Sequence, residues 1–319
     1  MMFLFNKILS ISPYVELLVR RIYWKNISLF QKIKGIIKTE KKIKKTKPLD
    51  FNKIIRLLQK QGIESGSILV VHSSYESIEH SGLTPPQVIQ RLLDFLGEQG
   101  TLAMPAIRKY SKKINNYLED ALINEITTYD TLKSKIWTGA LPFYMLRDKR
   151  SVISRFPINS MVAIGNMAEV MMKDNLLGNK PTACGINSSW NFCVNNNAFV
   201  VGIGIDLIHS LTIIHVAEDL LDSKWPVKDW YHERKFKIID RDYETIKVVK
   251  ERRRKWGALY FAEKTLRKDL IREGILGSFT IERVKVEVVN SKKLINYLNK
   301  KNKLGYPYFW VSRKLNKNE

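Results

Sequence analysis

The sequence predicts an α/β protein with a central mixed sheet flanked by helices. Residues 68–71 form a short apolar run rich in β-branched side chains, which is typical of a buried strand. Apolar residues then recur at helical spacing over residues 84–96, and residues 101–104 form a second apolar run. A strand, a helix and a strand in this order favour a parallel pair joined by a crossover.

The same alternation continues toward the C-terminus. Residues 161–164 and 198–205 are predicted to be strands, and residues 209–221 a helix. Beyond that helix, two strands are expected around residues 240–242, and one further strand over residues 279–289. Strands that alternate with helices along the chain define the α/β class.

Charge divides the 319 residues, whose formal net charge is +23, into three parts. Residues 1–47 hold twelve Lys or Arg and two Glu, residues 48–221 hold 16 of each sign, and residues 222–319 hold 26 basic and 13 acidic residues. We therefore predict a basic amphipathic helical extension at 1–47 and an α/β core at 48–221. Residues 222–319 are predicted to be a basic, aromatic-rich C-terminal subdomain that completes the core.

The N-terminal stretch is apolar but interrupted. It lacks a run of about 20 apolar residues that would span a bilayer, and it lacks a small-residue cleavage site. We predict a cytoplasmic protein without a transmembrane segment. The extension is expected to pack on its own domain, and contact with an anionic membrane or another subunit stays open. The two cysteines, Cys184 and Cys193, match no zinc or redox spacing, and no metal is predicted.

Polar residues follow the first predicted strands. His72, Ser73 and Ser74 come after the first strand, and Met104 closes the second. In open α/β sheets, ligands bind beyond the carboxyl ends of the strands, which places these residues on the functional edge. A lone histidine is more often structural than catalytic, so the residue types alone favour a structural role for His72.

Four stretches of the sequence form an ordered set of motifs. They are VHSS at 71–74 with GTLAMP at 100–105, TGAL at 138–141, RFPINSMVAIG at 155–165, and VVGIGIDLIHSLTIIHVAED at 200–219. Taken in order, they resemble the aminoglycoside 3-N-acetyltransferase family. Their order and spacing agree with the family over roughly residues 50–290. The resemblance implies a mixed sheet covered by helices and an acyl-coenzyme A dependent transfer to a primary amine.

The resemblance also implies roles for individual residues. Coenzyme A, as acetyl-CoA or another short acyl-CoA, is expected along the loop after the first strand, where hydroxyls and backbone N–H groups can bind phosphate and amide oxygens. The residues assigned to it are His72, Ser73, Ser74, Met104, Ser160 and Ser189. The residues assigned to the acceptor are Trp137, Arg155 and Trp225.

The catalytic residues assigned from the resemblance are Asn159, His215 and Glu218. The family pattern His-Pro-x-His-Ser reads Phe156-Pro157-Ile158-Asn159-Ser160 here, so an asparagine replaces the histidine near the reacting amine. Asparagine cannot take a proton, but it can hydrogen-bond the amine or polarise the thioester oxygen. His215 and Glu218 are three residues apart and share a helix face. The sequence does not decide which group removes the proton from the amine: His215, His72, a water or a group of the substrate.

The net charge predicts an acceptor that bears phosphates. The expected substrate is a nucleotide-linked amino sugar, with dTDP as the expected nucleotide, used in bacterial surface polysaccharide or lipopolysaccharide synthesis. The C-terminal aromatic and basic residues are expected to bind the nucleotide. One alternative is acetylation of aminoglycosides, which confers antibiotic resistance. Another is a non-catalytic relative that binds polyanions. No nucleic-acid partner is predicted, and a homodimer stays open.

Overall fold

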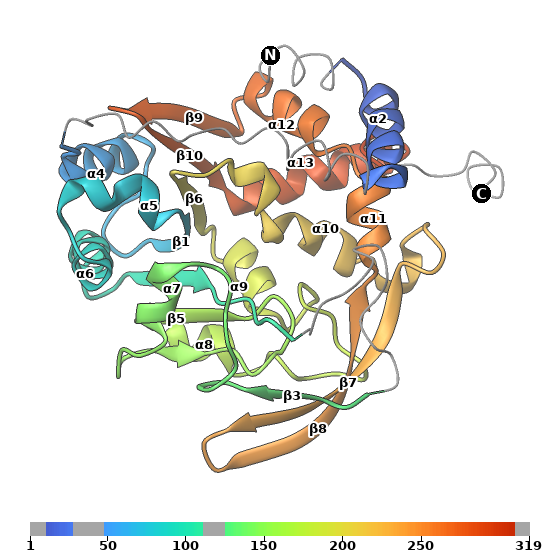
Figure 1. Ribbon diagram of the computed structural model, residues 1–319, viewed down its shortest axis with the longest axis horizontal. Helices are drawn as coiled ribbons and strands as arrows, with labels where there is room; N and C mark the ends of the chain where they lie inside the picture. The colour runs from blue at the N-terminus through green and yellow to red at the C-terminus, as the bar shows by residue number, and fades with distance from the viewer. Residues whose placement is uncertain (1–10, 28–47, 111–124, 310–319) are drawn as a thin grey trace.

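The computed structural model describes residues 11–27, 48–110 and 125–309. Of the predicted N-terminal extension, only residues 11–27 lie within the described part, and they contain helix α2 (Pro13–Lys25). The molecule has a seven-stranded central sheet with helices on both faces and a smaller three-stranded sheet beside it (Figure 1).

The central sheet is mixed, as predicted. Its strand order is β4-β5-β2-β1-β6-β10-β9. The three middle strands, β2, β1 and β6, run parallel, and β5 and β10 pair antiparallel to their inner neighbours. The strands are β1 (Ile68–Ser73), β2 (Thr101–Pro105), β4 (Val152–Ile153), β5 (Met161–Gly165), β6 (Phe199–Ile203), β9 (Leu276–Ile281) and β10 (Val284–Asn290).

The smaller sheet comes from two distant parts of the chain. Strand β3 (Thr127–Asp130) pairs parallel with β7 (Tyr231–Asp240), which pairs antiparallel with β8 (Tyr243–Arg252). Arg241, with φ of 56°, lies in the tight turn between β7 and β8. The two strands predicted around residues 240–242 are therefore present, and their hairpin reaches away from the central sheet toward the bottom of Figure 1.

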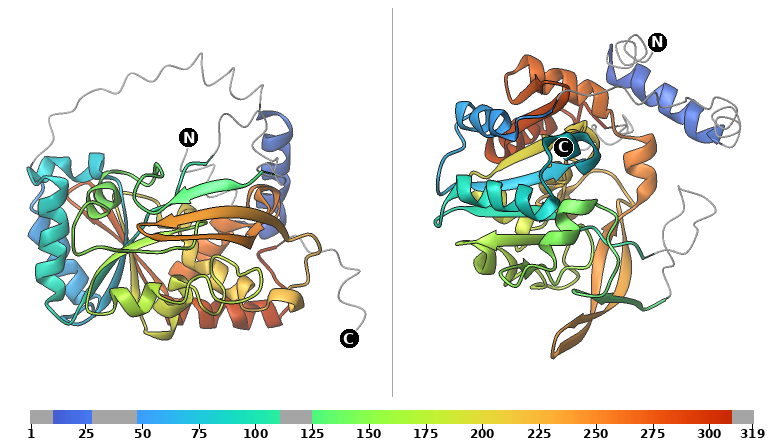
Figure 2. Two further views of the ribbon diagram at one scale, coloured as in Figure 1. Left: turned by 90° about the horizontal axis from the view of Figure 1, so that it is seen from below. Right: turned by 60° about the vertical axis from the view of Figure 1, so that its left-hand side comes forward.

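Helices cover both faces of the central sheet, because its strands are apolar on both sides. Along β1, Val70 contacts a cluster that contains Trp190 and Leu294, whereas Leu69 and Val71 face a second cluster. The helices are α4 (Phe51–Lys60), α5 (Tyr75–Ile78), α6 (Pro85–Leu96), α7 (Ala140–Met145), α8 (Ala168–Met172), α9 (Ser189–Asn195), α10 (Val216–Asp219), α11 (Arg254–Leu259), α12 (Glu263–Arg272) and α13 (Ser291–Lys303). Helix α2 lies at the opposite end of the molecule from α4 and α6 (Figure 2).

Three local predictions are wrong. The strand expected over 279–289 is the hairpin of β9 and β10, because Glu282 adopts φ of 56° in a turn that no Gly, Pro or Asn signals. The helix expected over 209–221 is broken into short segments around Ser210, whose carbonyl accepts from Thr212 N at 2.8 Å in a tight turn. The first strand continues through His72 to Ser73, so His72 belongs to the sheet rather than to a loop.

A close backbone contact holds the end of β1 against the end of β6. Gly204 has φ of 73°, and a Cβ on it would lie 2.4 Å from the Cβ of Ser77 in α5. Ser77 Oγ donates a hydrogen bond to the Gly204 carbonyl at 3.2 Å, and Ser74 N donates to Ile203 O at 3.0 Å. Only glycine combines this φ with this proximity, so Gly204 positions the turn that carries Ser73 and Ser74.

We expect Gly204→Ala to destabilise the protein by about 2 kcal/mol more than Gly274→Ala. Gly274 also has a positive φ, 66°, but nothing lies within 4 Å of the position that a Cβ on it would take, so that variant carries only the left-handed backbone cost of about 1–2 kcal/mol. Gly204→Ala adds the steric overlap with Ser77, and overpacking costs about 1–3 kcal/mol. Chemical denaturation measures both free energies of unfolding.

The double variant Gly204→Ala/Ser77→Gly separates the two contributions, because it removes the side chain that the new methyl group would meet. Partial recovery of stability is expected. Equal destabilisation by Gly204→Ala and Gly274→Ala would show that the contact with Ser77 does not constrain this turn.

Candidate active site

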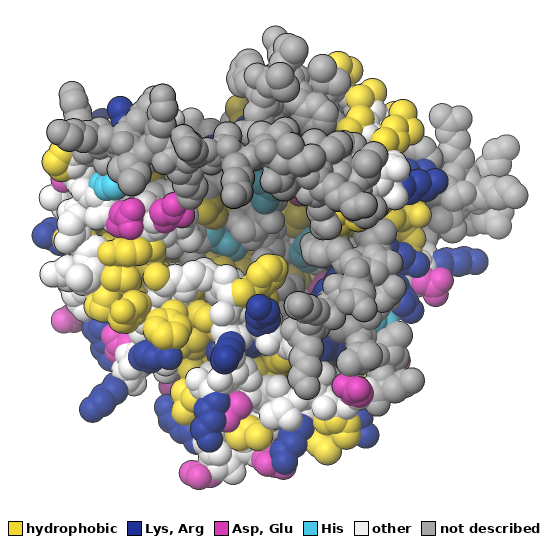
Figure 3. All heavy atoms as spheres, in the orientation of Figure 1, with side chains coloured by type: hydrophobic (Ala, Val, Ile, Leu, Met, Phe, Trp, Pro, Cys, Tyr) yellow, Lys and Arg dark blue, Asp and Glu magenta, His cyan; other side chains and the backbone are white. Residues whose placement is uncertain are grey.

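A cleft lies where the β7–β8 hairpin meets the loops beyond the central sheet. The cavity has a volume of about 120 Å³. Its walls come from the turn before β5, the loop before α9, the segment that leads into α10, and the strands of the hairpin. The lining residues are Ile158, Asn159, Ala183, Cys184, His215, Asp219, Tyr231, Lys250, Glu251 and Arg252. Figure 3 shows a hollow near the middle of the molecule's face with histidine side chains inside it.

Asn159 is held in the cleft wall by its backbone. It adopts φ of 50°, in the left-handed region that asparagine tolerates better than most residues. Its carbonyl accepts a hydrogen bond from the Trp190 indole Nε1 at 2.9 Å. The next residue, Ser160, is buried and its Oγ lies 3.0 Å from the Tyr129 hydroxyl. Contacts from α9 and β3 therefore fix the turn, and Asn159 lines the cleft.

His215 and Glu218 form a polar unit with Arg252 of β8. Glu218 Oε2 lies 3.1 Å from His215 Nδ1, and the Arg252 guanidinium lies 2.8 Å from the same nitrogen and 3.5 Å from Glu218 Oε2. The 3₁₀ segment Thr212–His215 runs directly into α10, which places the two side chains on one face as the sequence predicts. The Arg252 guanidinium can only donate, so in this geometry a neutral His215 accepts from it at Nδ1; the tautomer that donates Nδ1–H to Glu218 and holds the lone pair of a base on Nε2 requires Arg252 to turn from Nδ1 to the carboxylate.

The Glu218 carboxylate is 2% exposed. Burial alone raises the pKa of a carboxyl group, but the adjacent His215 and Arg252 outweigh burial and hold the pKa of Glu218 below its usual range. The carboxylate is therefore charged at neutral pH.

Asp219 is a functional candidate that the sequence analysis did not single out. It is 8% exposed, accepts from the Tyr231 hydroxyl at 2.6 Å and from the Cys184 backbone N–H at 2.9 Å, and lines the cleft. Burial raises the pKa of Asp219, although the Tyr231 hydrogen bond opposes this. The sequence feature that could have identified Asp219 is its position next to Glu218 in the stretch VAED. Burial also raises the pKa of the Cys184 thiol well above its usual value, so this thiol is uncharged.

A second cavity of about 290 Å³ adjoins the first through the shared residues Asp219 and Lys250. The loop 175–188 forms most of its wall. Lys250 Nζ lies 2.7 Å from Asp222 Oδ1. Asp219 lines both cavities, so a ligand larger than the His215 cleft could extend past Asp219 into the second cavity.

The residues assigned to coenzyme A lie near one another but in different environments. His72 is 5% exposed within β1, and its ring centroid lies 6.2 Å from that of Trp190. Ser73 ends β1 and Ser74 is the N-cap of α5. Met104 is fully buried in the core, and Ser160 and Ser189 are buried as well. None of the six lines the His215 cleft, and their binding roles stay predictions.

The three residues assigned to the acceptor are separate from the cleft. Trp137 is 70% exposed in the loop before α7. Arg155 forms an ion pair with Asp240, with 2.6 Å between Nε and Oδ2, and lies over the Tyr243 ring. Trp225 is 6% exposed and packs against Trp230. Its burial makes it a core residue, and substrate contact by any of the three stays a prediction.

The fold and the site define an α/β protein with a histidine–carboxylate pair beside the end of a mixed sheet. The family model for aminoglycoside 3-N-acetyltransferase matches residues 70–302, and the chain belongs to that family.

Individual relatives agree with this assignment. The chain is similar to aminoglycoside N(3)-acetyltransferase III from Salmonella sp, with 28% identity over 183 residues, which cover 56% of this chain and 62% of that protein. Among solved structures, sisomicin-bound AAC-VIa matches with a TM-score of 0.65 and 14% identity over 82% of this chain and 99% of that chain. The AAC-IIIb binary complex with CoASH matches with a TM-score of 0.61 and 17% identity over 82% of this chain and 98% of that chain. Likeness at such identities shows a shared fold.

These findings correct the expected acceptor. The prediction of a nucleotide-linked amino sugar for polysaccharide synthesis is wrong, because the matching family and relative are aminoglycoside acetyltransferases. The prediction used the net charge of +23 as if it acted at the site. Residues 222–319 do contribute Lys250 and Arg252 to the cleft, but these stand beside the carboxylates of Asp222 and Glu218, and Asp219 and Glu251 line the cleft as well.

Neither a metal-binding cluster nor a membrane-spanning helix is found among the described residues. Within residues 11–27, 48–110 and 125–309, no cluster of three or more His, Cys, Asp or Glu side chains is arranged to hold a metal ion, and the predicted absence of a metal stays a prediction. In the same part of the chain, no helix has the length and apolar character to cross a membrane.

His72 makes stability depend on pH. Burial lowers the pKa of His72 from its usual 6.5 to about 4. Between these values the unfolded chain binds a proton that the folded protein does not, so stability falls as the pH drops from 6.5 toward 4. We expect the wild type to lose about 2–3 kcal/mol more than His72→Gln between pH 7.5 and pH 4.5.

Chemical denaturation at the two pH values measures this difference. His80→Gln is the matched control, because His80 lies in the exposed 3₁₀ turn Glu79–Ser81. An identical pH dependence in the wild type and His72→Gln would show that His72 is not held neutral by burial.

Proposed function

We propose that this protein is an acetyl-CoA dependent aminoglycoside N-acetyltransferase. The observation that carries the proposal is the His215–Glu218 pair in a cleft that Asn159 also lines, within the segment that matches the family. A histidine oriented by a buried carboxylate is a suitable base for an amine that must lose its proton to attack a carbonyl carbon.

His215 acts as the base in this proposal. Arg252 first turns from Nδ1 to the Glu218 carboxylate, so that Nδ1–H can donate to Glu218. Nε2 then takes the proton from the acceptor amine as the new N–C bond forms and the C–S bond of the thioester breaks. The proton then passes from His215 to the departing thiolate. Asn159 provides a neutral hydrogen-bonding group at the position where the family pattern has a histidine, so it orients the amine or the thioester oxygen.

The local charges suit a polycationic acceptor. The basic side chains that line the cleft have acidic partners, since Lys250 pairs with Asp222 and Arg252 with Glu218. The Asp219 carboxyl lies between the two cavities and can receive hydrogen bonds from an amino or hydroxyl group of the acceptor. Exposed basic side chains much farther from the cleft than the Debye length, about 8 Å at physiological ionic strength, act weakly on a ligand there.

The residues around the end of β1 fit a coenzyme A chain, which supplies the acetyl group as a thioester. His72 Nε2 and Thr138 Oγ1 are buried polar atoms without a hydrogen-bond partner among the described residues. The Gly139 backbone, with φ of 100°, comes so near Ser73 that a Cβ on Gly139 would lie 3.8 Å from the Ser73 carbonyl. Ser73, Ser74 and Thr138 would hold the amide groups of the pantetheine arm.

The direct test follows free-thiol release from acetyl-CoA in the presence of gentamicin or sisomicin, with mass spectrometry of the aminoglycoside product. We expect thiol release that depends on the aminoglycoside and a product heavier by one acetyl group. Absence of transfer to every aminoglycoside tried would contradict the proposal and would favour a non-catalytic relative.

Substitutions in the cleft test the assigned roles. We expect His215→Asn to lower kcat by about 10²–10⁴-fold, because it removes the proton acceptor. Glu218→Gln is expected to lower kcat in the same direction by a smaller factor, because the amide retains an oxygen for Nδ1–H but loses the charge. The matched control is His209→Asn, since His209 pairs with Glu263 outside the cleft. A wild-type rate in His215→Asn would remove His215 from the mechanism.

A further inference from the structure

The second cavity beside the His215 cleft takes no part in the proton transfer proposed above. Its volume of about 290 Å³ exceeds the 120 Å³ of the cleft. Asp219 and Lys250 line both cavities, so the two spaces adjoin each other. Since aminoglycosides consist of several linked rings, the part of an acceptor beyond the reacting amine has room in the second cavity.

Most of the wall of the second cavity is uncharged. The loop 175–188 contributes the amide side chains of Asn179 and Asn187, which can both donate and accept hydrogen bonds. The same loop contributes Leu177 and Ile186, whose side chains are 56% and 77% exposed. Exposed apolar side chains beside neutral polar groups suit a sugar ring, because its C–H face is apolar and its rim carries hydroxyl groups.

A lysine places a positive charge where the two cavities meet. Lys250 Nζ lies 2.7 Å from the Oδ1 of Asp222, and Asp222 lines the second cavity. Because Lys250 is part of the same chain, its ammonium group is present beside Asp222 at a high effective concentration. It therefore neutralises a carboxylate that an ammonium group of a ligand would otherwise contact.

The backbone of Lys250 is fixed to the wall of the second cavity. Lys250 N donates a hydrogen bond to the Pro181 carbonyl at 3.0 Å, and Thr182 forms an isolated parallel bridge with Lys250. These contacts join the loop 175–188 to β8, so the lysine starts from a defined point beside the cavity. Its side chain is 29% exposed, and a partly buried charge is screened less than one on the open surface.

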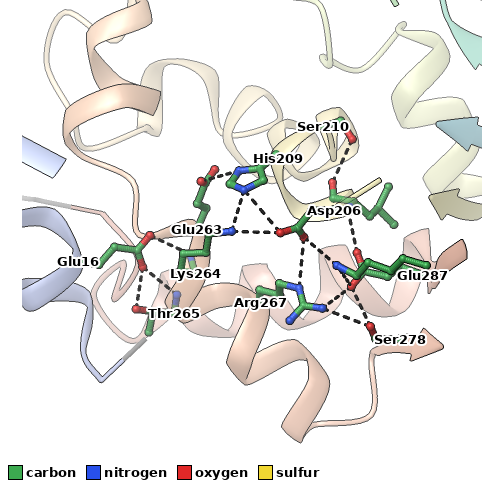
Figure 4. A network of polar contacts seen from close by, with 12 residues as sticks. Glu16, Asp206, His209, Ser210, Glu263, Lys264, Thr265, Arg267, Ser278 and Glu287 are labelled. Atoms are coloured by element: carbon green, nitrogen blue, oxygen red, sulfur yellow. Dashed lines mark hydrogen bonds and ion pairs between the residues drawn. The ribbon is translucent and has the colours of Figure 1, made fainter. Parts of the chain in front are cut away.

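The network of ion pairs around Asp206 and Glu287 offers a comparison (Figure 4). Lys285 Nζ lies 3.3 Å from Asp206 Oδ1 and 2.9 Å from Glu287 Oε1, and the lysine side chain is 33% exposed. None of these three residues lines either cavity. Lys285 therefore resembles Lys250 in exposure and pairing but has no access to a ligand in the cleft, which makes it a matched control.

We propose that the second cavity is the subsite for an uncharged, hydroxyl-bearing ring of the acceptor, and that Lys250 determines this specificity. The inference rests on the proposed acetyl transfer and adds which part of the acceptor enters this cavity. The reacting amine lies at His215, and the amides of Asn179 and Asn187 bond hydroxyl groups of the next ring. An ammonium group on that ring meets the Lys250 ammonium and finds Asp222 already neutralised. Like charges brought together are unfavourable, so the specificity arises from repulsion.

Paired acceptors that differ by one amino group test the proposal. Neomycin and paromomycin form one pair, and kanamycin B and kanamycin A form the other, because one amino group of the first compound is a hydroxyl group in the second. Thiol release from acetyl-CoA gives kcat/KM for each compound. We expect Lys250→Gln to raise the ratio of kcat/KM for the amino compound to that for the hydroxyl compound about fivefold in at least one pair, mainly through KM. A factor of about five corresponds to about 1 kcal/mol, the repulsion of two unit charges about 4 Å apart in water.

Two further variants separate the local charge from other effects. Lys250→Arg retains the charge and is expected to keep the wild-type ratio. Lys285→Gln removes one positive charge elsewhere and is expected to leave the ratio unchanged, so it controls for the lower net charge. An unchanged ratio in both pairs with Lys250→Gln, or an equal shift with Lys285→Gln, would overturn the inference and leave the proposed acetyl transfer intact. No transfer by the wild type to any of the four compounds would overturn the proposed function and the inference with it.

Discussion

The buried Glu218 carboxylate is the group on which the arrangement of the candidate site depends. A buried carboxylate without positive or hydrogen-bonding partners is strongly unfavourable. Here His215 comes from the same helical segment and Arg252 from β8, so the charge balance draws two distant parts of the chain together. The Tyr231 hydroxyl of β7 bonds the neighbouring Asp219 in the same way. The β7–β8 hairpin is thereby held over the end of the central sheet, and the cleft forms between them.

The charges of Glu218 and Arg252 also affect which nitrogen of His215 carries a proton. His215 Nδ1 has an anion at 3.1 Å and a cation at 2.8 Å. The guanidinium can only donate, so the position of Arg252 selects the tautomer: on Nδ1 it leaves the proton on Nε2, and when it turns to Glu218 the proton can sit on Nδ1. The proposed role of His215 as a base requires the second arrangement, in which Nε2 is free to accept a proton from an amine. Asn159, held by the Trp190 indole, brings a neutral amide to the same cleft. In the proposed mechanism, the departure from the family's histidine at this position leaves the acid–base role to His215.

The sequence predicted the fold class and the parallel pair of β1 and β2, because alternating apolar runs and helical spacing depend on local patterns. The His215–Glu218 pair was predictable from the spacing and the resemblance. The contacts of Arg252 with His215 and of Tyr231 with Asp219 were not predictable. They depend on where the paired strands β7 and β8 lie relative to α10, and no local sequence pattern indicates that position. The hairpin turn at Glu282 was missed because its residues are not typical of turns. The acceptor was mispredicted because net charge reports on the whole chain, whereas recognition depends on the few charges at the cleft.

A crystal structure with coenzyme A and sisomicin bound tests the central claim most directly. The account predicts that one amino nitrogen of sisomicin lies within hydrogen-bonding distance of His215 Nε2, in the cleft that Asn159 and Asp219 line. The coenzyme A sulfur should point at that nitrogen from the side of Ser73 and Ser74. An aminoglycoside bound with every amino group away from His215, or a thiol directed to another part of the molecule, would contradict the account.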